Sequence, residues 1–182
     1  MKARAALICT CSSATAGYGR FSIAATAYTG LLFAQGLARD LWQGSHQTLD
    51  LLAQAAAEGS AAMLLVAAII GAPAATVAPL GWTLFAAALV HFVILALEHF
   101  AASSPTLHHE LAVRAIRSGP YRRLFWLGAI GLGGVAPVLL VALAASTSFS
   151  LVVLVPAALV ALAGSLAWEY IWVDAGQSVP IS

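Results

Sequence analysis

The sequence predicts an all-α integral membrane protein, a helical bundle of about five transmembrane helices. Hydrophobic residues make up 62% of the 182 residues and charged residues only 8%, whereas soluble domains average about 45–50% and about 25%. Several apolar stretches also reach the roughly 20 residues that a helix needs to cross a bilayer. The lipid bilayer is therefore an expected partner. The formal net charge of +1 gives no reason to expect nucleic acid as another.

Five stretches are long and apolar enough to be spans, and segments rich in proline, glycine or polar residues separate them. Before them, we expect residues 1–20 to form an N-terminal tail, because the one apolar run there is short and small polar residues follow it. The first span is the most polar, so we expect it to pack inside a bundle. The expected spans are residues about 21–38, 49–71, 80–102, 123–145 and 150–173.

The loop between the third and fourth spans is long enough to contain a short surface helix. Pro105 and Thr106 precede the expected first turn, and Gly119 and Pro120 follow the last, as helix start and stop signals do. Half of the eight basic residues lie in or just after this helix. The positive-inside rule therefore favours a cytoplasmic position for the loop. These basic residues are Arg114, Arg117, Arg122 and Arg123.

Tryptophan and tyrosine side chains gather at the same end of the predicted helices as this basic loop. Trp82 is the only tryptophan at the opposite end. Because aromatic belts normally mark both membrane interfaces, the surplus at one end indicates either a simple belt or a docking surface. The residues at the basic end are Trp42, Tyr121, Trp126, Trp168, Tyr170 and Trp172.

The candidate functional residues are acids and histidines inside the predicted spans. Glu58 lies near the middle of the second span, where an ionised side chain costs at least about 2.5–3.5 kcal/mol. Counting the rise of a helix per residue places His91 at a similar depth. Glu98, His99 and Glu169 form a shallower tier on the side of the basic loop. Desolvated carboxylates and histidines can exchange protons near neutral pH, so the two tiers indicate a proton pathway.

The same residues admit a structural interpretation. Glu58 can be protonated, or hydrogen-bonded to His91, and can thereby lock the second span to the third. Glu98 and Glu169 can be interface residues that reach towards water. Depth alone does not separate the two hypotheses. We expect no catalytic residue and no metal site, because the two cysteines stand close together near the start with no later partner.

The fourth span carries a cluster of glycines ahead of Pro137. Proline removes one backbone donor and frees the carbonyl four residues earlier, so we expect a bend there. Small residues allow either a neighbouring helix or a flat ligand to approach the backbone closely. The glycines are Gly128, Gly131, Gly133 and Gly134.

Five segments, taken in order, carry a family resemblance. They are AYTGLLFAQGLARDLW (27–42), LLAQAAAEGSAAMLL (51–65), LEHF (97–100), RSGPYRRLFWLGAIGLGGVAPVLL (117–140) and WEYIWVDAGQSVPIS (168–182). With these segments, residues about 21–182 resemble the C-terminal half of the NrfD/PsrC-like family. That family comprises membrane subunits of polysulfide-reductase-type complexes and of alternative complex III.

The resemblance implies a membrane subunit of a respiratory oxidoreductase in a bacterial inner membrane. Such a subunit has no covalently bound cofactor. It exchanges electrons between membrane quinone (menaquinone or ubiquinone, shared with partner subunits) and an iron–sulfur subunit. A molybdopterin enzyme or cytochrome subunits are further implied partners. Some relatives are proposed to move protons through buried acids, which fits the five candidate residues, although their assignment here rests on depth.

The family pattern is also longer than this chain, because relatives usually have more spans arranged in two bundles. Either a second polypeptide supplies the N-terminal bundle, or the chain is a fragment of a longer product, or the quinone-linked activity has been lost. Two rival functions remain. A small multi-span transporter should show an internal repeat, and the sequence has no evident one. In a purely structural anchor subunit, every buried acid would form an interhelical hydrogen bond.

Overall fold

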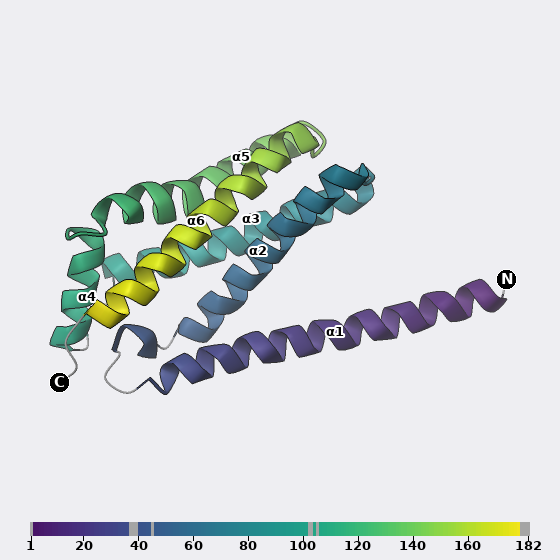
Figure 1. Ribbon diagram of the computed structural model, residues 1–182. Helices are drawn as coiled ribbons and strands as arrows, with labels where there is room; N and C mark the ends of the chain where they lie inside the picture. The colour runs from purple at the N-terminus through teal and green to yellow at the C-terminus, as the bar shows by residue number, and fades with distance from the viewer. Residues whose placement is uncertain (1, 37–39, 45, 102–103, 105, 179–182) are drawn as a thin grey trace.

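The computed structural model describes residues 2–36, 40–44, 46–101, 104 and 106–178, with side chains from Tyr18 onward. Every regular element in these ranges is a helix (Figure 1), which confirms the predicted all-α class. Two of the elements, η2 and η3, are π-helical. In chain order the elements are α1 (Lys2–Ala34), η1 (Asp40–Gln43), α2 (Gln47–Ile70), α3 (Ala74–Ala96), η2 (Leu97–Ala101), α4 (Leu107–Arg117), η3 (Leu124–Val135), α5 (Ala136–Ser146) and α6 (Leu151–Ser178).

Four helical segments of the described chain are long and apolar enough to cross a membrane. They correspond to the second, third, fourth and fifth expected spans. Ile69, Val152 and Leu166 point outward from them with more than two thirds of their surface exposed, as lipid-facing side chains do. Within the described residues, the structure therefore gives four candidate spans, whereas the sequence predicted five. The segments are Gln47–Ile70, Ala74–Ala101, Leu124–Ser146 and Leu151–Ser178.

The first helix accounts for the difference. α1 is continuous from Lys2 to Ala34, so residues 2–20 are helical where a tail was expected. The helix ends before the expected end of the first span, whose residues 37 and 38 lie outside the described ranges. Polar residues at 17–20 dilute the apolar part that remains inside the helix, and α1 is not among the four candidate spans. Its N-terminal end lies apart from the bundle in Figure 1.

The four spans form two antiparallel pairs whose short turns lie at the same end of the bundle (Figure 1). Between α2 and α3 the chain reverses at Gly71, which has a φ of 64°. Glycine adopts this left-handed conformation without a Cβ penalty and commonly ends helices in this way. The basic loop with α4, the segment η1 and the end of α6 lie at the opposite end. This arrangement agrees with the predicted sidedness of the loops.

The predicted surface helix is α4. The hydroxyl of Thr106 accepts a hydrogen bond from the backbone N–H of His109 at 3.1 Å, which caps the first turn. Ala112 and Ile116 are buried in a core cluster that also contains Trp168 of α6. The helix is therefore both capped and anchored against the end of the bundle.

The sequence predicted a bend near Pro137 in the fourth span. The structure shows a change of helix type there, from π-helix to α-helix. Residues Leu124–Val135 form the π-helix η3, in which the N–H of Ala136 bonds to the carbonyl of Gly131, five residues back. Regular α-helix begins at Ala136. A proline at the start of α5 costs little, because the first N–H groups of an α-helix need no partner within that helix.

Glycines bring η3 and α6 into backbone contact. A Cβ built on Gly164 of α6 would overlap the backbone nitrogen and Cα of Gly133. A Cβ on Gly128 would lie 2.7 Å from the Cβ of Ala167, closer than side chains normally approach. These contacts favour helix packing over a flat ligand as the reason for the glycine cluster.

The aromatic surplus at the basic end is partly interior. The ring centroids of Trp42 and Trp172 lie 5.7 Å apart, and Phe33 of α1 packs edge-on against Trp172 at 4.9 Å. These rings join α1, η1 and α6. Trp126 remains exposed at the start of the fourth span. Packing between elements thus explains much of a surplus that the sequence assigned to a belt or a docking surface.

Candidate functional site

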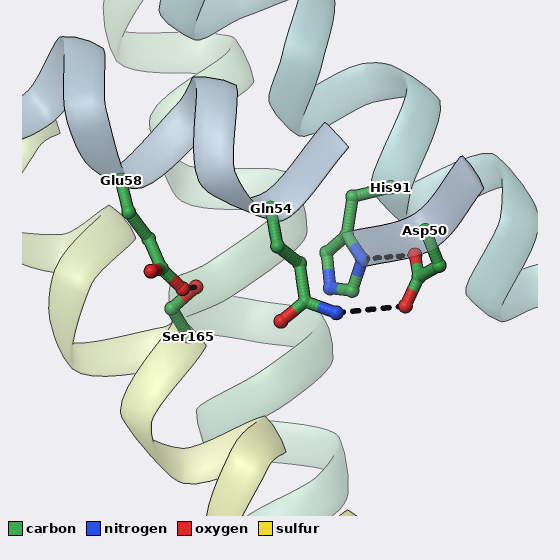
Figure 2. A network of polar contacts seen from close by, with 5 residues as sticks. All are labelled: Asp50, Gln54, Glu58, His91 and Ser165. Atoms are coloured by element: carbon green, nitrogen blue, oxygen red, sulfur yellow. Dashed lines mark hydrogen bonds and ion pairs between the residues drawn. The ribbon is translucent and has the colours of Figure 1, made fainter. Parts of the chain in front are cut away.

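Three polar side chains form a row along one face of α2. Asp50, Gln54 and Glu58 are spaced four residues apart, which places them one above another on the helix. Figure 2 shows the row turned towards α3 and α6. Asp50 and Gln54 are buried, and Glu58 is half-buried. The site is therefore inside the bundle, along the first half of a membrane span.

Asp50 is at the centre of the polar contacts. Its Oδ1 lies 2.6 Å from Nδ1 of His91 on α3, and its Oδ2 accepts a hydrogen bond from Nε2 of Gln54 at 2.7 Å. Both carboxylate oxygens are thus satisfied in a place where an unpaired charge would be costly. The short distance to the imidazole is typical of a charge-assisted hydrogen bond.

The sequence did not identify Asp50, and it paired His91 with the wrong acid in the locking hypothesis. Glu58 accepts a hydrogen bond from Oγ of Ser165 on α6 at 2.6 Å, and His91 lies opposite Asp50 instead. Depth estimated from assumed helix ends cannot give the register between two helices. The four-residue spacing of Asp50, Gln54 and Glu58 was the available signal.

Glu58 and Glu169 line one groove where α1, α2 and α6 meet. The groove has a volume of about 260 Å³, and Gln54 and two threonines of α1 also line it. The charge of Glu58 acts on Glu169, so the two acids are electrostatic neighbours. Glu169 therefore belongs with Glu58, whereas the sequence grouped it with Glu98 and His99.

Glu98 and His99 line a second pocket, of about 380 Å³, between η2 and α4. The charges of Asp50 and His91 act on Glu98, so the acid is electrostatically coupled to the central pair. His99 is buried. Its ring nitrogens form no hydrogen bond of good geometry with the described residues, although the backbone of Leu95 lies near the ring.

Comparison with known families gives a match over most of the chain. The family model for "Polysulphide reductase, NrfD" matches residues 13–181. The chain belongs to the NrfD family. The match begins inside α1, so part of the segment that was expected to be a tail falls within the NrfD region. Searches of curated proteins and of solved structures found no match.

In this NrfD chain, the polar groups form a discontinuous path from the α4 pocket to the α1 groove. Gln54 joins the two parts, because its Nε2 bonds to Asp50 while it also lines the groove with Glu58. The Oε1 of Gln54 is buried without a partner among the described residues. Water in the gaps would connect the groups. The direct contacts are His91 with Asp50 and Asp50 with Gln54. Gln54, Glu58 and Glu169 share the α1 groove, and Glu98 lies in the α4 pocket.

Two titratable groups outside the spans hold the basic end of the NrfD bundle together. The hydroxyl of Tyr121 donates to Asp174 of α6 at 2.5 Å, and this hydrogen bond raises the pKa of Tyr121. Burial lowers the pKa of His109 on α4, with the charge of Asp40 opposing the shift. Both side chains are therefore mainly neutral near pH 7. We assign them to packing and not to the polar path.

Proposed function

We propose that this chain couples electron transfer between membrane quinone and an iron–sulfur partner to proton movement in a respiratory oxidoreductase. Membership of the NrfD family supports the coarser statement, a multi-pass membrane subunit of such a complex. The observation that supports the proton part is the buried contact of Asp50 with His91 and Gln54. Ionisable groups inside a span are expensive, and usually mark ion or proton pathways.

The proposed complex has several parts. Menaquinone or ubiquinone acts as a substrate shared with a complementary membrane half. An iron–sulfur subunit exchanges electrons with that quinone, and a molybdopterin enzyme or cytochrome subunits complete the electron path. The assembly resides in a bacterial inner membrane. In this proposal, the residues of the present chain contribute the proton path.

Isolation of the complex tests the partners. When the tagged chain is extracted from its native membrane in a mild detergent, we expect an iron–sulfur subunit and a second membrane subunit to copurify. Mass spectrometry identifies the subunits, and elemental analysis measures the iron. An iron-free oligomer of this chain alone would contradict the proposed electron-transfer role and would favour the small multi-span transporter.

Acid-to-amide substitutions test the proton path. Asp50→Asn and Glu58→Gln keep the size of each side chain and one acceptor oxygen, replace the second oxygen with an NH2 donor, and remove the titrating group. We expect both variants to assemble and to retain quinol-linked electron transfer, with fewer protons moved per electron. The measurement is proton uptake or release in sealed vesicles, recorded together with electron transfer. Asp174→Asn is the matched control, because Asp174 bonds to Tyr121 outside the path, and it should leave the ratio unchanged.

The geometry also favours a specific alternative, a purely structural anchor subunit. Asp50 connects α2 to α3 through His91, and Glu58 connects α2 to α6 through Ser165, as interhelical locks would. On that reading, Asp50→Asn and Glu58→Gln reduce the yield of the assembled complex, while the assembled fraction moves protons at the normal ratio. This result would reject the proton path and leave the family assignment intact.

A further inference from the structure

A basic pocket opens at the membrane boundary where the loop after α4 enters the fourth span. It has a volume of about 560 Å³ and is lined by the turn at residues 118–120 and by Arg122, Arg123, Trp126 and Leu127. The span begins one residue after Arg123. The two arginines therefore lie at the level of lipid headgroups, and the two apolar side chains lie in the first turn below it.

The guanidinium groups in this pocket are available for an external anion. Arg122 and Arg123 are exposed, and among the described residues neither guanidinium forms an ion pair or hydrogen bond. The arginines of the neighbouring α4 differ. Arg114 pairs with Glu110 at 2.8 Å, and Arg117 donates to a backbone carbonyl of η2 at 2.8 Å. We therefore expect an external anion to bind at Arg122 and Arg123 and not at the two arginines of α4.

The remaining wall of the pocket suits a hydrocarbon chain. Leu127 is 71% exposed and Trp126 is 43% exposed, both on the outer surface of a membrane span. The indole N–H of Trp126 donates to the carbonyl of Arg117 at 3.3 Å, which orients the ring. The pocket thus combines a lipid-facing apolar wall with two arginines that form no ion pair with the described residues.

We propose that this pocket binds an anionic glycerophospholipid. The headgroup phosphate lies between Arg122 and Arg123, which can each donate two parallel hydrogen bonds to phosphate oxygens. The acyl chains follow Trp126 and Leu127 into the bilayer. An acidic protein surface would match the charges but would not use an apolar wall below headgroup level. Basic pockets beside membrane helices are suited to anionic headgroups for this reason.

Lipid competition tests the proposal. The chain, purified within its complex in mild detergent, is titrated with phosphatidylglycerol and phosphatidylcholine, and bound lipid is counted by native mass spectrometry. We expect phosphatidylglycerol to be retained preferentially. Arg122→Gln and Arg123→Gln should each weaken its binding by about fivefold, since each arginine near the surface contributes roughly that factor. Arg20→Gln on α1 removes the same charge elsewhere and should change binding less than twofold.

Two further measurements separate the sources of the phosphate and guard against a misfolded variant. Glycerol phosphate in large excess should fail to displace the lipid, and displacement would show that the pocket binds a soluble anion instead. Arg122→Lys and Arg123→Lys keep the charges and should retain most of the preference at low salt. Equal retention of the two lipids by the unmodified chain, or unchanged binding in both glutamine variants, would overturn the proposal.

Discussion

Replacing Gly164 with alanine is expected to destabilise the bundle more than any other change of a single hydrogen to a methyl group. The new Cβ would overlap the backbone of Gly133, and backbone atoms cannot rotate away as a side chain can. η3 and α6 must therefore separate along their shared face. Overpacking of a well-packed interior costs about 1–3 kcal/mol, and occasionally more. Thermal unfolding in mild detergent, followed by tryptophan fluorescence, should show a lower midpoint for the variant.

Gly59→Ala is the matched control for this experiment. Gly59 also lies inside a span, but a Cβ built there has no neighbouring atom within 4 Å. Alanine is the better helix former by about 1 kcal/mol, so this variant should unfold at the same temperature as the unmodified chain or slightly higher. If Gly164→Ala behaved like Gly59→Ala, the close approach of η3 and α6 would be refuted.

Replacing Asp50 with alanine is expected to have the second large effect, again on stability. The change leaves the buried Nδ1 of His91 without its partner and Nε2 of Gln54 without its acceptor. Removing one partner of a buried ion pair costs about 3–5 kcal/mol, because the other partner stays desolvated. We expect a lower free energy of unfolding in detergent and less assembled complex in the membrane. Asp50→Asn should avoid most of this loss, since its amide can still accept from either neighbour.

A double-mutant cycle separates this pair from its surroundings. His91→Ala removes the same contact from the α3 side, so the double variant should lose less stability than the sum of the two single losses. Coupling between groups in contact is typically about 0.5–3 kcal/mol. Glu110→Ala breaks an exposed pair with Arg114, which should cost no more than about 1 kcal/mol. Strictly additive losses for Asp50 and His91 would mean that their contact contributes nothing.

Much of the fold was predictable because a membrane span requires a long apolar segment. That requirement can be checked for each segment without knowing its contacts. Length and apolarity located the second to fifth spans. Thr106 and Pro120 predicted the two ends of the surface helix, because one caps the start of a helix and the other cannot continue it. Glycine spacing predicted a close approach to the backbone at η3, by a helix or by a flat ligand. The first expected span depended on where its helix ended, because that span carries several polar residues. No local rule indicated that α1 would start as early as Lys2.

The candidate site was predictable in residue type but not in pairing. Burial of a carboxylate is costly wherever it occurs in a span, so Glu58 and Glu98 could be singled out from sequence. Asp50 escaped notice because it stands near the expected end of a span, where an exposed acid is ordinary. Its burial depends on α3 passing close enough for His91 to cover it. Similarly, Glu169 joins Glu58 only because α6 packs beside α2 near α1.

By itself, the sequence determined that this protein is a helical membrane bundle, where four of its spans lie, and which family it resembles. These properties follow from composition, segment length and the order of motifs. All three can be read from the sequence without knowing which helices are in contact. Only the tertiary structure decided that His91 faces Asp50, that Gln54 joins two pockets and that Gly164 touches Gly133. Those contacts depend on the register and rotation of one helix against another. Both are set by the packing of many small side chains at once.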